Sequence, residues 1–146
     1  RIPLLIFEPG RDTGMDIHDY TSAVDVLSTL SYVTGHKTPE WEEGIVMPPY
    51  AATNPDSNRN IYVVQAIDNP QNAPLTEAST VVIKENYKLH YYFGYPETGN
   101  VEIVKLFDIK SDPDEMIDLY SSKKGTALEL LDELKRKLKE VNEPYL

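Results

Sequence analysis

Three strand-like segments joined by short connections most constrain how this chain of 146 residues can fold. Residues 79–85 and 87–93 are rich in β-branched or aromatic side chains, and Glu85-Asn86 lies where a tight hairpin turn would join them. A third such segment, residues 101–109, follows a loop that contains proline and glycine. Because parallel strands need long crossovers, these short connections favour an antiparallel meander.

A helix follows the three segments. Residues 126–141 carry an apolar stripe at helical spacing, and the sequence Thr126-Ala127-Leu128-Glu129 has the pattern of a capping box. Asn142-Glu143-Pro144 ends the pattern. We expect this helix to cover the sheet with a stripe of five buried side chains: Leu128, Leu131, Leu134, Leu138 and Val141.

The first part of the chain has a different organisation. Residues 2–7 are continuously apolar and predict a strand covered on both faces. Residues 22–33 predict a helix with Ala23, Val26, Leu27 and Leu30 on one face, started by Thr21 or Ser22 and ended by Gly35. Between residues 36 and 74 lie six of the 11 prolines, so we expect mostly loop there, with one strand at 61–67.

Composition excludes several kinds of function. The formal net charge is −10, with 24 acidic and 14 basic side chains, which argues against nucleic acid as a partner. No apolar run approaches the ~20 residues that span a bilayer, so we expect no membrane partner. The absence of cysteine excludes disulfides, thiolate zinc sites and a cysteine nucleophile within these residues. The compartment stays open.

Acidic clusters are the most conspicuous polar feature, and we expect no metal site among them. The carboxylates near residue 112 (Asp108, Asp112, Asp114, Glu115 and Asp118) lack the spacing of an EF-hand loop. Asp112-Pro113-Asp114-Glu115 instead predicts the capped start of a short helical turn. The ligand-type residues near the N-terminus (Asp12, Asp16, His18 and Asp19) are a nonspecific set, and a surface loop is the better interpretation.

The strand predicted at residues 87–93 is dense in aromatic side chains. Exposed tyrosine rings can stack on sugars, although alternation along a strand sends half of the side chains toward the core. The candidates for substrate binding are His90, Tyr91, Tyr92 and Tyr95. We assign no catalytic residue, because the sequence contains no Gly-x-Ser-x-Gly elbow, Walker loop or dinucleotide fingerprint.

Three stretches together resemble the C-terminal part of the sulfatases, which belong to the alkaline-phosphatase-like superfamily. Residues 1–10 (RIPLLIFEPG) are similar to the family's Arg-Val-Pro-Leu-Ile-Ile-x-x-Pro-Gly, and residues 22–30 (SAVDVLSTL) to its Ser-His-Val-Asp-Leu-Leu-Pro-Thr-Leu. Residues 87–89 (YKL) and 105–119 (KLFDIKSDPDEMIDL) resemble its Tyr-Lys-Tyr hairpin and Glu-Leu-Tyr-Asp-Leu-x-x-Asp-Pro-x-Glu-x-x-Asn-Leu. Ala23, Ser28, Lys105 and Asp118 depart from these patterns at scaffold positions.

The resemblance implies a fold class and a domain organisation. The implied fold class is α/β with α+β character in the C-terminal part: a fragment of an alkaline-phosphatase-like fold, with an antiparallel sheet of about four strands packed by a C-terminal helix. Residues 1–52 would supply the terminal strand and helix of a catalytic domain, and residues 53–146 a C-terminal subdomain. The chain begins at Arg1 without an initiator methionine, so we expect it to continue a longer chain whose N-terminal catalytic domain is its partner.

The resemblance also implies the chemistry of the parent enzyme. Sulfatases hydrolyse sulfate esters with a formylglycine, made in a Cys/Ser-x-Pro-x-Arg motif, and a divalent cation, usually calcium. We expect neither group in these residues, because in the family both precede the strand that residues 1–10 resemble. The near-match Ser111-Asp112-Pro113-Asp114-Glu115 has glutamate where the motif needs arginine, so we assign it no catalytic role. The chain would then be inactive alone and would give structural support and one wall of the substrate pocket. Two alternatives stay open: a stand-alone acidic binding module, or the C-terminal part of a phosphate or phosphonate ester hydrolase of this superfamily.

Overall fold

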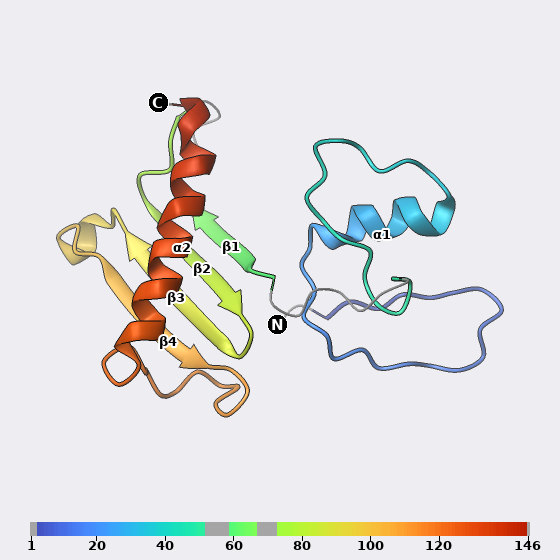
Figure 1. The fold of residues 1–146 in the computed structure, drawn as a ribbon, viewed down its shortest axis with the longest axis horizontal. Coiled ribbons are helices and arrows are strands. Elements are labelled where there is room, and N and C mark those ends of the chain that lie inside the picture. The colour runs from blue at the N-terminus through green and yellow to red at the C-terminus, as the bar shows by residue number, and fades with distance from the viewer. Residues whose placement is uncertain (1–2, 52–58, 67–72, 146) are drawn as a thin grey trace. The chain divides into compact units, whose positions relative to one another are not determined.

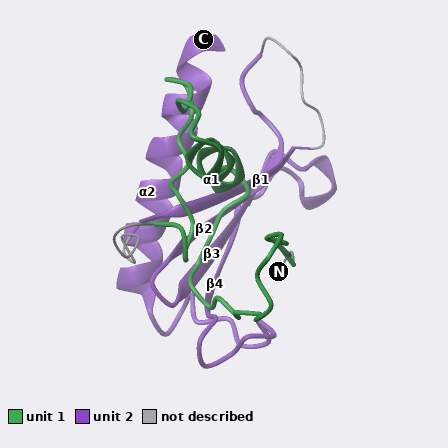
Figure 2. Cartoon of the chain, turned by 90° about the vertical axis from the view of Figure 1, so that its right-hand side faces the viewer, with its two compact units in different colours: residues 1–55 green, residues 56–146 purple. Residues whose placement is uncertain are grey.

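The computed structural model of the chain describes residues 3–51, 59–66 and 73–145. It divides into two compact units, residues 1–55 and 56–146 (Figure 2). None of the described helices is both long enough and apolar enough to span a membrane.

The second unit is a four-stranded antiparallel sheet covered on one face by a long helix (Figure 1). Its strands are β1 (Ile61–Ala66), β2 (Ala78–Lys84), β3 (Tyr87–Phe93) and β4 (Ile103–Asp108), in the spatial order β1-β2-β3-β4. The helix is α2 (Lys124–Asn142), and two short 3-10 turns, η1 (Pro96–Thr98) and η2 (Glu143–Tyr145), complete the unit. The predicted sheet and C-terminal helix are confirmed; residue 67 of the predicted strand 61–67 lies outside the described residues.

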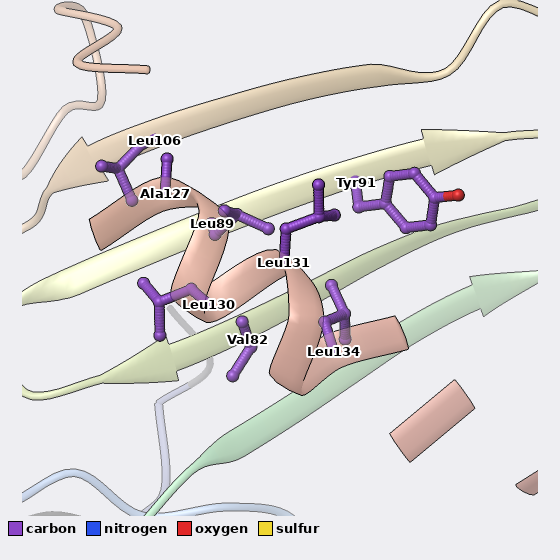
Figure 3. Packing of buried hydrophobic residues seen from close by; sticks show 8 residues of the cluster. All are labelled: Val82, Leu89, Tyr91, Leu106, Ala127, Leu130, Leu131 and Leu134. Carbon is purple, nitrogen blue, oxygen red and sulfur yellow. The ribbon is translucent and has the colours of Figure 1, made fainter. Parts of the chain in front are cut away.

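The register of the strands places the core between the sheet and α2. Val82, Leu89 and Leu106 lie opposite one another on neighbouring strands and are fully buried. Alternation along β3 puts Tyr91 on the same face as Leu89. Figure 3 shows these four side chains and their partners from α2, which are Ala127, Leu130, Leu131 and Leu134. The predicted hairpin turn is present, and Glu85 adopts a positive φ of 52° in it.

The prediction for α2 was right in position and wrong in two details. The side chain of Leu128 is 43% exposed and Val141 is also exposed, whereas Ala127 and Leu130 are buried. The buried face of α2 therefore includes Leu131 and Leu134, as predicted, but extends toward Ala127 and Leu130 and leaves out Leu128 and Val141. The capping box is also wrong, because the helix begins at Lys124 and Thr126 already lies within its first turn.

The segment between β4 and α2, residues 109–123, contains turns and no helix, so the helical turn predicted at 112–115 is wrong. Glu115 has a φ of 55°, a left-handed conformation that cannot continue a right-handed helix. The Asp112 side chain accepts a hydrogen bond from the backbone N–H of Ile117 at 2.8 Å, which closes a wider turn. The residues from 109 to 119 are called the 109–119 loop from here on.

The first unit is built around α1 (Asp25–Thr34), which Gly35 ends in the left-handed conformation as predicted. We predicted that the side chain of Thr21 or Ser22 caps the start of this helix, but neither of them does so. Instead, the carboxylate of Asp25, in the first turn, accepts a hydrogen bond from the backbone N–H of Ser22 at 2.7 Å. The buried side of α1 is polar. Asp25 and Thr29 accept hydrogen bonds from the backbone N–H groups of Ile45 and Met47, at 3.1 and 2.9 Å.

Two apolar features of the first unit are exposed. Leu30, which we expected on the buried face of α1, is exposed, because the polar side of the helix contacts residues 45–47 instead. Residues 3–7 of the predicted strand 2–7 form no strand, and Leu5 and Phe7 are 94% and 84% exposed. Residue 2 lies outside the described residues. A strand needs a neighbour for its backbone hydrogen bonds, and within the described part of the chain segment 3–7 has no strand partner.

Candidate functional site

The face of the sheet opposite α2 carries the main cluster of polar and aromatic side chains in the second unit. Side chains alternate along a strand, so Lys88, His90 and Tyr92 of β3 share this face while Leu89 and Tyr91 point to the core. His90 lies opposite Lys105 on β4 and opposite Val81 on β2. This surface is called the open face.

Glu115 from the 109–119 loop reaches across the open face and contacts two residues of β3. Its Oε1 accepts a hydrogen bond from Lys88 Nζ at 2.6 Å, and its Oε2 lies 2.9 Å from His90 Nε2. A carboxylate can only accept, so Nε2 of His90 carries the proton and Nδ1 of the neutral ring is an acceptor. The Tyr92 hydroxyl, 3.2 Å from Nδ1, then donates to it. Four side chains thus form one hydrogen-bonded chain: Lys88, Glu115, His90 and Tyr92.

Ring contacts fix the orientation of the imidazole. The His90 ring stacks on Tyr92 with centroids 6.0 Å apart and planes inclined by 21°. Phe107 packs edge-on against the same imidazole, with ring centroids 5.5 Å apart. The imidazole is therefore mostly buried, with its two nitrogens directed at Glu115 and Tyr92.

This surrounding alters the acid–base properties of the cluster. Burial lowers the pKa of His90, and the nearby charge of Lys88 lowers it further, against the opposing effect of Glu115. Burial raises the pKa of Glu115, but the contacts with Lys88 and His90 outweigh it and leave a net decrease. Burial and the charge of Glu115 raise the pKa of Tyr92. At neutral pH the cluster therefore holds an ionised Glu115, a neutral His90 and a protonated Tyr92.

Backbone and side-chain hydrogen bonds hold the 109–119 loop beside β4. The N–H of Leu119 donates to the carbonyl of Leu106 at 2.7 Å, and the Leu106 N–H donates to the Asp118 carboxylate at 3.1 Å. At the other end, the Ile109 N–H donates to the carbonyl of Asn86 at 2.8 Å. The loop is thus fixed at both ends, and Glu115 is presented to the open face from between them.

A second contact extends the site toward the end of β3. The Tyr95 hydroxyl lies 2.7 Å from Ser79 Oγ, and Ser79 is paired with Tyr92 across β2 and β3. The structure therefore gathers His90, Tyr92 and Tyr95 in one region. Tyr91 does not share it, because its side chain lies in the core on the opposite face (Figure 3). Its ring stacks on Phe93, and Lys135 Nζ lies 4.9 Å from the ring centroid.

Three of the carboxylates near residue 112, those of Asp108, Asp112 and Asp118, accept hydrogen bonds from backbone N–H groups. The Asp108 carboxylate accepts from the N–H groups of Lys110 and Ser111, and Asp118 accepts from those of Leu106 and Tyr120. Among residues 3–51, 59–66 and 73–145, no three His, Asp or Glu side chains gather in a way that could hold a metal ion.

Sequence reasoning missed Lys88 and the role of Glu115. The alternation Lys88-x-His90-x-Tyr92 could have revealed that these three side chains share one face. Glu115 lies 25 residues from His90 in a segment that we expected to be helical, so no periodicity indicated their contact.

Comparison with known proteins places the chain in a family. The model of the C-terminal region of N-sulphoglucosamine sulphohydrolase matches residues 1–144. The chain belongs to this family. Arylsulfatase K of Xenopus laevis is 30% identical over 96% of this chain and 25% of its own length. Arylsulfatase K of Homo sapiens is 25% identical over 81% of this chain and 22% of its own length.

The chain spans about a quarter of the length of the curated relatives that it matches. A solved structure has the same fold, with a TM-score of 0.54 over 82% of this chain and 24% of its own, at 20% identity. That structure holds a protein in complex with its substrate, D-glucosamine-2-N,6-O-disulfate. The expected relation to the C-terminal region of sulfatases is confirmed.

Proposed function

We propose that this chain is the C-terminal part of an enzyme that hydrolyses sulfuric esters, and that it does not hydrolyse them alone. The observation that carries the proposal is the match of residues 1–144 to the C-terminal sulfatase family. The relatives that share this sequence are arylsulfatases about four times as long, so most of each relative lies outside the matched part. The role of this chain is structural support together with one wall of the substrate pocket.

The open face is the part of the chain best suited to form that wall. It combines aromatic rings with hydroxyl groups, which suit the apolar faces and the hydroxyls of a sugar. Two cationic side chains, Lys88 and Lys105, lie beside His90 in a chain of formal charge −10. We therefore assign substrate contact to His90, Tyr92 and Tyr95, and a sulfated sugar, as in the structure of similar fold, is the substrate class that this chemistry suits.

The reactive groups of the enzyme belong, in this proposal, to the remainder of the parent protein. The described residues offer no set of ligands for calcium, and the chain has no cysteine that could become formylglycine. Ser111 lies in the one Ser-x-Pro-x-Glu sequence, but Glu115 of that sequence is bound to Lys88 and His90. The residues of this chain do not fit either group, and we derive no catalytic step from them.

The exposed apolar residues of the first unit are consistent with a longer parent. Leu5 and Phe7 are among the most exposed apolar side chains of the chain, and such residues in a row are costly to leave in water. Segment 3–7 has the continuous apolar character of a strand buried on both faces. We propose that it adds to the large sheet of the catalytic domain.

A sulfate-ester assay tests the proposal. The 146-residue chain and a longer protein encoded by the same reading frame are each assayed with 4-nitrophenyl sulfate and with 4-nitrophenyl phosphate. We expect hydrolysis of the sulfate ester by the longer protein alone. Turnover by the 146-residue chain, or a preference of the longer protein for the phosphate ester, would overturn the proposal.

A further inference from the structure

Glu115, His90 and Tyr92 are linked by two hydrogen bonds, and the protonation state of His90 decides which of the groups donate. With His90 neutral, Nε2–H donates to Glu115 and Nδ1 accepts from the Tyr92 hydroxyl. The single proton of the Tyr92 hydroxyl is then used internally. Only the oxygen lone pairs of Tyr92 are left for a ligand, so the residue can accept a hydrogen bond but cannot donate one.

Protonation of His90 reverses the second hydrogen bond. Both ring nitrogens of the imidazolium are donors, so Nδ1–H donates to the Tyr92 oxygen across the same 3.2 Å. The hydroxyl proton of Tyr92 is thereby released and becomes a donor for a ligand. The proton also adds a positive charge beside Lys88 and Lys105, which Glu115 balances only in part.

We infer that Tyr92 is an acid-activated donor for the anionic group of a sulfated sugar, and that His90 and Glu115 are the positioning residues that control it. The inference rests on the proposed function for the ligand class and on the contacts above for the mechanism. A sulfate oxygen accepts hydrogen bonds and donates none, so it fits the protonated state of the cluster and not the neutral one.

The groups around His90 allow it to become protonated while Glu115 stays ionised. The charged or titratable residues that face it are Lys88 and Tyr92 on its own strand, Lys105 on β4 and Glu115 on the 109–119 loop. The pKa of Glu115 is below its usual value, so this carboxylate stays ionised while His90 takes up its proton. The non-glycine residue Glu115 adopts a positive φ to reach the imidazole, and such backbone strain is typical of functional positions.

Calorimetric titration of the 146-residue chain with D-glucosamine-2-N,6-O-disulfate tests the inference. We expect binding to be about tenfold tighter at a pH below the pKa that NMR gives for His90 in the folded chain than at about pH 7.5, because a hydrogen bond to a charged group adds roughly one decade in affinity. Tyr92→Phe keeps the ring and removes the donor, so it should abolish the difference between the two pH values. The matched control, His36→Gln, changes an exposed histidine of the first unit and should keep the difference.

Two further measurements separate control of His90 from a merely structural role. NMR titration of the imidazole should show a lower pKa of His90 in Glu115→Gln, and the gain in affinity should move to lower pH by the same amount. Inorganic sulfate at equal concentration should bind at least about tenfold more weakly than the sugar, because it cannot use the aromatic rings. Equal binding of both probes would overturn the sugar as ligand.

The inference is overturned if the wild-type chain binds the sugar equally at both pH values, or if Tyr92→Phe keeps the acid enhancement. A titration without binding at either pH overturns it as well. None of these results depends on turnover, whereas the proposed function stands or falls with sulfate-ester hydrolysis by the longer protein. The two failures are therefore distinguishable.

Discussion

The carboxylate of Glu115 lies 2.6 Å from the ammonium group of Lys88, although 27 residues separate the two in the sequence. Both side chains are mostly buried at the open face, so water screens their interaction less than it screens a surface pair. This ion pair fixes the 109–119 loop to β3. Its strength therefore indicates how firmly Glu115 is held beside His90.

A double-mutant cycle with Lys88→Met and Glu115→Gln measures that strength. We expect a coupling free energy of about 1–3 kcal/mol in urea unfolding of the 146-residue chain. The cycle of Lys135→Met and Glu102→Gln, a more exposed pair at 2.8 Å, is the control and should give less than about 1 kcal/mol. A coupling at the open face no larger than in the control would contradict the anchoring role of Glu115.

The second prediction concerns the pH dependence of stability. The pKa of His90 is lower in the folded chain than its usual value of 6.5. Below about pH 6.5 the imidazole is therefore protonated to a greater extent in the unfolded chain than in the folded chain. The free energy of unfolding should therefore fall as the pH drops below about 6.5, by at most about 1.4 kcal/mol per pH unit. It should level off below the pKa that His90 has in the folded chain.

Urea unfolding at a series of pH values between about 5 and 7.5 checks this slope. His90→Gln cannot titrate and should flatten it, while His36→Gln should leave it unchanged. If the slope persists in His90→Gln, other groups cause it and the burial of a neutral His90 is not the reason.

The sequence predicted the second unit much better than the site. Residues 78–93 have strong β propensity around a two-residue turn, and both are local properties that survive in the fold. The stripe in α2 was displaced, because spacing alone does not distinguish Leu128 from Leu130 when both lie on the edge of an apolar face. The buried partner of a helix comes from tertiary packing, which the pattern does not contain.

The contact between Glu115 and His90 depends on non-local structure. It requires three features together: the left-handed backbone at Glu115, the hydrogen bond from Leu119 N–H to the Leu106 carbonyl, and the alternation of side chains along β3, which places His90 on the open face. In the first unit the same limitation is visible at Asp25, whose carboxylate binds the N–H of Ile45 across 20 residues. For this reason α1 buries its polar side, although its sequence predicts a buried apolar side.

A pair of leucines in α2 tests the observed packing. Leu131 is 8% exposed and lies in the core, so Leu131→Ala should lower the free energy of unfolding by about 2–5 kcal/mol. Leu131→Asp should cost more, because a charge would enter an apolar core. Leu128→Ala is the matched control and should cost less than about 1 kcal/mol. Equal losses for the two alanine variants would show that the buried face of α2 is placed wrongly.

Two glycines with left-handed backbone separate conformational strain from steric clash. A Cβ at Gly94 would overlap with the carbonyl oxygen of Thr76, whereas a Cβ at Gly99 would meet nothing within 4 Å. Their φ angles are similar, at +77° and +66°. We expect Gly99→Ala to cost about 1 kcal/mol from backbone strain alone. Gly94→Ala should cost clearly more in the same thermal or urea unfolding experiment, and a smaller loss at Gly94 than at Gly99 would contradict the close approach.

The last prediction addresses the exposed segment at the start of the chain. Since Leu5 and Phe7 lie almost fully in water, the double variant Leu5→Asp, Phe7→Asp should change the unfolding free energy of the 146-residue chain by less than about 0.5 kcal/mol. In the longer protein the same variant would place two charges in the sheet that segment 3–7 is proposed to join. Soluble yield and sulfate-ester hydrolysis should then fall together, because buried unpaired charges cost several kcal/mol. Val101→Asp, at another exposed apolar residue, should leave both unchanged. Full yield and activity of the double variant in the longer protein would mean that segment 3–7 stays in water there too.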